Sequence, residues 1–150
     1  MNIIDFRIVK HLLNSEIEVY SFITNSGQYS EIEFFFDKYY SSRGYKELMS
    51  RISAMSSNKK FDNEFFERCD INDKIYSIKQ NRLLLYLIKV SQDCVIWGNG
   101  GMLPANFTQK TISTMLQDHL DNIKLISIAI KKNNINEINI YQNLNRTIKL

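Results

Sequence analysis

The feature that most constrains the fold is a set of apolar segments joined by very short polar connections in the middle of the chain. The segments are 75–78, 83–90 and 94–97. Residues 83–90 are apolar nearly throughout, which is typical of a central strand covered on both faces. Connections as short as 79–82 and 91–93 force neighbouring strands to pair antiparallel. The sequence therefore predicts an antiparallel β-meander.

Helical periodicity ahead of this meander predicts two successive helices. Ser30 and Glu33 have the spacing of a capping box. The first helix then has an aromatic inner face at helical spacing, formed by Ile32, Phe35, Phe36, Tyr39 and Tyr40. After a break at 41–44, a second apolar stripe follows: Tyr45, Leu48, Met49, Ile52 and Met55. We expect the two elements to form a helical hairpin.

The first residues of the chain carry a weaker pattern. A short first helix is predicted from four apolar residues at helical spacing: Phe6, Val9, Leu12 and Leu13. Residues 16–23 alternate between apolar and polar side chains, which indicates a strand. Asn25-Ser26-Gly27 then predicts a turn.

A long helix is predicted after the meander, with Thr108 or Thr111 as its N-cap and Asn133-Asn134 at its end. Residues 138–150 could form a last short hairpin. The elements together predict an α+β fold in one domain, 1–150. Its expected architecture is an N-terminal helical hairpin packed on an antiparallel β-meander, followed by a long C-terminal helix and that short hairpin.

Composition narrows the class of protein. With 150 residues and 44% hydrophobic side chains, the chain can bury a core. Its net charge of +3 suits a nucleic acid only weakly and equally suits a solubilising surface. Cys69 and Cys94 fit no zinc or disulfide pattern, so we expect core thiols in a reducing compartment. Charged residues near the N-terminus exclude a signal peptide, and 83–88 is too short to span a bilayer. We expect a cytoplasmic protein that does not associate with a membrane.

The residues themselves leave several chemical interpretations open. His11 and His119 have no partners at metal-ligand spacing, so we expect no metal ion and no small-molecule cofactor. Gly98-Asn99-Gly100-Gly101 could be a backbone nest for a phosphate or a tight turn. Lys79 and Arg82 could hold a phosphodiester or simply be charged residues at a sheet edge. Tyr86 could stack on a base or belong to the core.

The order of these elements, with Asn81-Arg82-Leu83-Leu84-Leu85-Tyr86 followed by Gly98-Asn99-Gly100-Gly101, resembles a divergent RelE-like group of the RelE/ParE toxin superfamily. The resemblance covers roughly residues 30–102. It implies metal-independent cleavage of mRNA, usually on the ribosome, by a toxin that an antitoxin protein holds inactive. Basic and tyrosine side chains position the phosphate for attack by the ribose 2′-hydroxyl.

Carried over to this chain, the resemblance makes Arg82 and Lys79 the catalytic residues and Lys110 a weaker RNA-binding candidate. Tyr86, Asn99 and Gly100 complete the expected RNA-binding set. Family nucleases also carry a basic residue just after the third strand, where this chain has 99–104 without one. Two alternatives therefore remain: a catalytically silent RelE-fold protein that binds a protein partner or the ribosome, and a gyrase-directed toxin of the ParE type.

Overall fold

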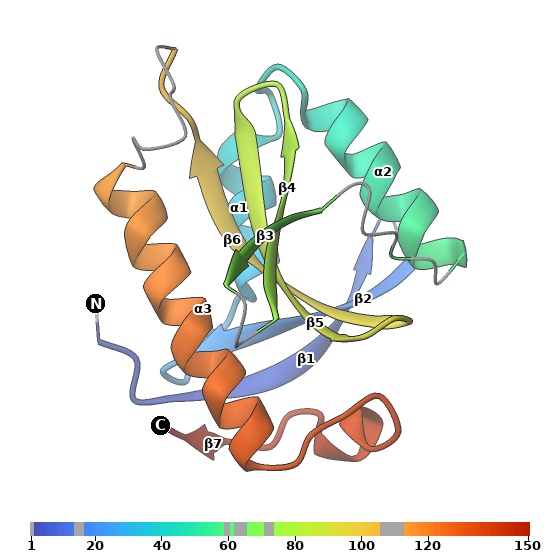
Figure 1. The fold of residues 1–150 in the computed structure, drawn as a ribbon, viewed down its shortest axis with the longest axis vertical. Helices are drawn as coiled ribbons and strands as arrows, with labels where there is room; N and C mark the ends of the chain where they lie inside the picture. Colours follow the sequence, from blue (N-terminus) through green and yellow to red (C-terminus); the bar gives the residue numbers. More distant parts are fainter. Residues whose placement is uncertain (1, 14–16, 59–60, 62–65, 71–73, 106–112) are drawn as a thin grey trace.

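The fold is built on a seven-stranded sheet with the strand order β3-β4-β5-β6-β2-β1-β7 (Figure 1). It comes from a computed structural model, which describes residues 2–13, 17–58, 61, 66–70, 74–105 and 113–150. The strands are β1 (Asp5–Leu13), β2 (Ile17–Thr24), β3 (Glu67–Asp70), β4 (Ile75–Gln80), β5 (Leu83–Ser91), β6 (Cys94–Met102) and β7 (Ile148–Lys149). The helices are α1 (Glu31–Tyr39), α2 (Tyr45–Asn58), α3 (Thr114–Lys132) and the short 3-10 helix η2 (Ile140–Asn143).

The sheet is mixed. Strands β3 to β6 form an antiparallel meander, which confirms the central prediction from sequence. Strand β2, however, joins β6 in parallel, with Tyr20 opposite Ile96. Strands β1 and β7 extend the sheet beyond β2, each antiparallel to its neighbour. The expected architecture was therefore wrong, because the antiparallel meander is only part of a larger mixed sheet, although the α+β class holds.

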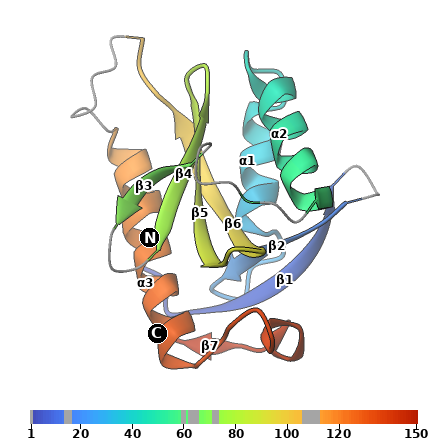
Figure 2. The same ribbon diagram turned by 45° about the vertical axis from the view of Figure 1, so that its right-hand side comes forward.

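Helices cover both faces of the sheet. Helix α3 crosses one face, and α1 with α2 covers the other (Figure 1; Figure 2). Strand β5 shows why its sequence is apolar throughout. Its side chains from Leu84, Tyr86 and Ile88 enter the core beneath α3. Its alternate side chains from Leu83, Leu85 and Leu87 enter the core beneath α1 and α2.

The predicted first helix is wrong, because residues 5–13 form strand β1. Phe6 and Ile8 are both buried in the core on the α3 side, which is the two-residue period of a strand. The same apolar residues also fit a helical period, and long pairing with β2 decides between the two. The helical hairpin of α1 and α2 consequently lies between β2 and β3 and is not N-terminal.

Two further expectations, for residues 98–101 and 138–150, were wrong. Residues 98–101 do not form a turn or a nest at the end of a strand, because β6 continues through them to Met102. The expected hairpin at 138–150 is absent from the described C-terminal residues, where η2 leads to the single strand β7, which pairs with β1. Both observations follow from tertiary pairing that no local pattern encodes.

Helix α3 confirms the predicted long helix with a different cap. Ser113 is its N-cap, and the Ser113 hydroxyl accepts a hydrogen bond from the Leu116 amide at 3.2 Å. Thr108 and Thr111 lie outside the described residues. Asn133 ends the helix as expected, donating its backbone N–H to the carbonyl of Ala129. No helix among the described residues combines the length and apolar character needed to cross a membrane.

Candidate functional site

The two residues expected to be catalytic lie at the end of the sheet formed by the β4–β5 turn. Lys79 is exposed near the end of β4, and Arg82 is exposed in the turn itself. The Arg82 Nε donates to the carbonyl of Leu103 at 2.6 Å, which ties the side chain to the chain just beyond β6. From α2, the Arg51 Nη1 donates to the carbonyl of Lys79 at 3.3 Å. Three cationic residues thus surround this end of the sheet.

Tyr86 lies elsewhere, in the core beneath α3. Its side chain is only 2% exposed, and burial raises the pKa of its hydroxyl well above the ordinary value of 10.0. A ring in this position cannot stack on a base, so Tyr86 contributes to packing. Lys110 lies outside the described residues.

Asn99 and Gly100 sit near the end of β6, facing α1. The Asn99 Nδ2 donates to the Glu31 Oε2 at 2.8 Å, and the Asn99 Oδ1 accepts from the Gly100 amide at 2.8 Å. Burial raises the pKa of Glu31, and its hydrogen bond from Asn99 partly offsets that effect. Because the Gly100 N–H is already used, it is not the phosphate-binding nest that the sequence suggested.

Asn99 and Gly100 nevertheless line a cleft, which we call the β6 cleft. It has a volume of about 460 Å³ and lies between α1, the end of β6 and the start of α3. Its other lining residues are Phe34, Asp37 and Lys38 from α1, and Met115 and His119 from α3. The cleft therefore combines an aromatic ring, an ammonium group, a carboxylate, an amide and an imidazole.

His119 is the titratable group of the β6 cleft with a shifted pKa. Burial lowers its pKa below the ordinary value of 6.5, and the nearby charge of Lys38 lowers it further, against the opposing effect of Asp118. The imidazole is therefore neutral at pH 7 and able to accept a proton. Lys38 extends over α3, with its Nζ 3.3 Å from the Met115 Sδ.

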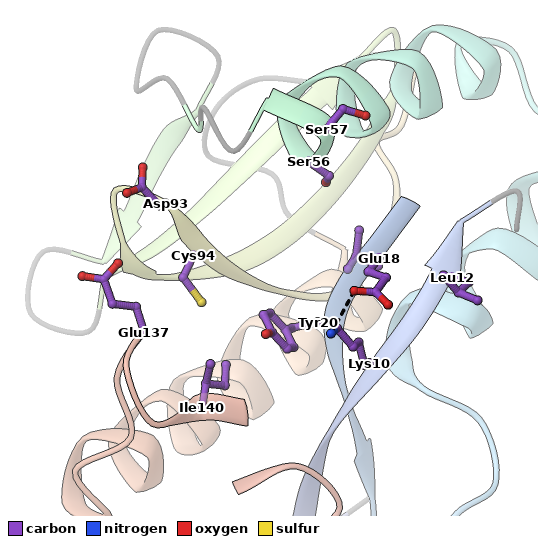
Figure 3. A pocket seen from close by; sticks show the side chains of 11 residues that line it. Lys10, Leu12, Glu18, Tyr20, Ser56, Ser57, Asp93, Cys94, Glu137 and Ile140 are labelled. Atoms are coloured by element: carbon purple, nitrogen blue, oxygen red, sulfur yellow. Dashed lines mark ion pairs between the residues drawn. The ribbon is translucent and has the colours of Figure 1, made fainter. Parts of the chain in front are cut away.

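Another cavity, with a volume of about 720 Å³, lies between β1, β2, the end of α2, the β5–β6 turn and η2 (Figure 3). Figure 3 shows Tyr20, Cys94 and Ile140 lining it from β2, β6 and η2. Its Lys10 and Glu18 form an ion pair at 2.8 Å. Burial raises the pKa of the Cys94 thiol to about 11, and also raises the pKa of Tyr20. Neither group is prepared for acid–base or nucleophilic chemistry near pH 7.

Metal chemistry finds no support in the part of the chain that the structure describes. Within it, no group of three or more His, Cys, Asp or Glu side chains could hold a metal ion. The β6 cleft thus remains the place where polar groups with useful chemistry converge.

Sequence reasoning found part of the β6 cleft and missed the rest. Asn99 and Gly100 were expected to bind RNA, whereas Phe34, Lys38 and His119 were not. Phe34 and Lys38 are four residues apart on α1, as are Met115 and His119 on α3, so each pair shares one helix face. That spacing is a usable signal, but nothing in the sequence indicates that the two faces meet across β6.

Comparisons with protein-family models, with curated proteins and with solved structures found no match to this chain.

Proposed function

We propose that this chain is a RelE-like toxin that cleaves mRNA in the cytoplasm, and that the β6 cleft binds the RNA. The observation that supports this most is the meeting of Asn99 and Gly100 with Lys38 and His119 in one cleft. Phe34 is 50% exposed at the same place and offers a face on which a base can stack. An antitoxin protein and the ribosome are the partners that this function requires.

The chemistry follows from the groups present. His119 accepts the proton of a ribose 2′-hydroxyl, whose oxygen then attacks the adjacent phosphorus. The bond from phosphorus to the 5′-oxygen of the next nucleotide breaks, and that oxygen takes a proton from water. The hydroxide left behind takes the proton from His119, which returns the imidazole to its neutral form. The products are a 2′,3′-cyclic phosphate and a free 5′-hydroxyl. Lys38 supplies positive charge to the phosphate as negative charge develops on its oxygens.

Arg82 and Lys79 act outside the β6 cleft in this proposal. The hydrogen bond to Leu103 leaves the terminal nitrogens of the Arg82 guanidinium as donors for a second phosphate. These residues therefore hold the RNA strand further along its backbone. Their loss should weaken RNA binding, while the loss of His119 should slow the bond-breaking step.

The assignment of His119 predicts a pH profile. A base must be neutral to act, so the rate should fall as pH drops through the pKa of His119. Since burial and Lys38 lower that pKa, the acidic midpoint should lie below 6.5. Asp37 and Asp118 are the nearby acids, and neutralising Asp118 should move the midpoint lower still, because its charge favours the protonated imidazole.

The test is expression in a bacterial host with growth and mRNA integrity followed, together with cleavage of mRNA by purified protein on programmed ribosomes. We expect growth arrest and discrete cuts for the wild type. His119→Ala should lose roughly 10²–10⁴-fold in rate and regain part of it with added imidazole. Lys38→Ala should lose at least about tenfold, and Lys132→Ala, an exposed lysine at the far end of α3, should act like the wild type.

Other outcomes separate the candidates. Full loss in Arg82→Ala with no effect in His119→Ala would move the reaction to the β4–β5 turn. Intact mRNA and normal growth with every variant would reject cleavage. They would favour the catalytically silent binding protein, a candidate supported by the position of Arg82 and Lys79 outside the β6 cleft and by the burial of Tyr86.

A further inference from the structure

A second surface of α1 carries a groove most of whose lining residues lie outside the β6 cleft. This aromatic groove has a volume of about 650 Å³ and contains rings from Tyr29, Phe34, Phe36, Tyr40 and Tyr45. Tyr29 precedes α1, Tyr45 begins α2, and the other rings belong to α1 or follow it directly. Only Phe34 and Asp37 also reach the β6 cleft, so the two sites are neighbours along one helix.

The rings are exposed to an extent that packing does not explain. Tyr29, Phe34 and Tyr40 are 57%, 50% and 68% exposed. Two ring pairs lie in the groove, with the centroids of Tyr29 and Phe34 6.0 Å apart and those of Phe36 and Tyr45 6.1 Å apart. Clustered exposed aromatic side chains mark binding surfaces more often than isolated ones do.

The charges of the groove select the kind of ligand. The carboxylates of Glu33 and Asp37 line it together with the rings. Glu33 lies 3.7 Å from His11 Nδ1, and its Oε1 also accepts from the Ser30 amide. These two carboxylates disfavour a phosphate here, unlike in the β6 cleft, where the ammonium group of Lys38 accompanies Asp37. They attract a cation, and the faces of the rings do the same through their quadrupoles.

The groove is also held in shape before any ligand arrives. The capping box of Ser30 and Glu33 fixes the start of α1, and Phe35 and Tyr39 anchor the helix in the core beneath it. A preformed site loses little conformational entropy on binding. The chain as a whole carries a net charge of +3, whereas Glu33 and Asp37 give the groove two carboxylates.

From ring exposure and charge complementarity together, we propose that the aromatic groove binds an arginine- or lysine-bearing segment of a protein partner. The cationic side chains of the segment lie over the exposed rings of the groove, with Glu33 and Asp37 as counter-charges. This inference does not depend on RNA cleavage, because the groove would bind the same segment in a catalytically silent protein.

Titration calorimetry with short capped peptides tests the proposal. The probe is a peptide of alternating arginine and alanine, and its control replaces each arginine with citrulline, which has nearly the same shape without the charge. Tyr40→Ala removes a ring, with Tyr141→Ala as the control because Tyr141 is 67% exposed on another surface. Glu33→Gln removes a charge while its amide oxygen can still complete the capping box. Glu47→Gln, in the first turn of α2, is its control.

We expect the arginine peptide to bind and the citrulline peptide to bind at least tenfold more weakly. Tyr40→Ala and Glu33→Gln should each weaken binding by roughly three- to thirtyfold, and neither control should change it. Equal binding of both peptides, or unchanged affinity in both groove variants, would overturn the proposal. Binding of a single-stranded RNA oligonucleotide that is lost in Tyr40→Ala would also overturn the proposal, because it would show that the groove binds RNA. The peptide measurements do not depend on whether the protein cleaves RNA.

Discussion

At the scale of single residues, Gly100 shows how closely β5 and β6 approach each other. A Cβ atom built on Gly100 would overlap the carbonyl oxygen of Leu84, which is backbone and cannot rotate away. The register between β5 and β6 shifts close by, with Leu85 opposite Gly100 and Leu87 opposite Trp97. Glycine is therefore required here by the irregular pairing of two strands and not by a turn.

Gly100→Ala should accordingly destabilise the protein by about 2 kcal/mol or more, because the two strands must move apart. Gly101→Ala is the matched control, since its added Cβ would meet the flexible side chains of Leu116 at 3.0 Å and Met115 at 3.1 Å. Urea unfolding followed by circular dichroism measures both. Equal stabilities for the two variants would show that the Leu84 carbonyl does not restrict this position.

Only some residues of the candidate site could be predicted from the sequence. The motif at 98–101 predicted a site at Asn99 and Gly100, and both residues line the β6 cleft. These residues belong to a strand and not to the expected turn or nest. An Asn-Gly pair is common in turns and equally suits a strand that another backbone approaches closely. Lys79, Arg82 and Tyr86 share one continuous segment, yet Lys79 and Arg82 are exposed at the β4–β5 turn while the pleat of β5 directs Tyr86 into the core.

At the scale of elements, the capping box of α1 was predicted from two residues and is present. The Ser30 hydroxyl accepts from the Glu33 amide at 3.3 Å, and the Glu33 carboxylate accepts from the Ser30 amide at 3.0 Å. Helices α1, α2 and α3 were predictable because their apolar stripes are local signals, although the cap of α3 is Ser113 and not Thr108 or Thr111. Strand β1 was not predictable, since its apolar residues fit both a helical and a strand period. Its pairing with β2, which decides between the two, leaves no local signal.

Ser30→Ala should lower the free energy of unfolding by about 1 kcal/mol, and up to about 2 because Ser30 is fully buried. Ser113→Ala, which removes the simpler cap of α3, should cost no more than this. Differential scanning calorimetry of both variants provides the comparison. A larger loss at Ser113 than at Ser30 would mean that the second, reciprocal hydrogen bond of the capping box adds nothing.

At the scale of the whole molecule, the sheet joins two cores that lie on its opposite faces. The core beneath α3 includes Ile126, and the core beneath α1 and α2 includes Leu48 and Trp97. Strand β5 contributes side chains to both. The sequence predicted the β4–β6 meander and the helices α1, α2 and α3. It did not predict the parallel β2–β6 contact that joins β1 and β7 to the meander, because pairing between distant segments leaves no periodic trace.

Because β5 belongs to both cores, we expect them to unfold in one cooperative transition. Leu48→Ala and Ile126→Ala should each cost about 2–5 kcal/mol, since both side chains are fully buried. Trp97 is the only tryptophan and lies on the α1–α2 side, so its fluorescence reports that core, while circular dichroism reports the whole fold. Ile126→Ala lies on the opposite face, yet it should shift the fluorescence and circular dichroism transitions to the same urea concentration. A fluorescence midpoint left at its wild-type value would mean that the two faces of the sheet unfold separately.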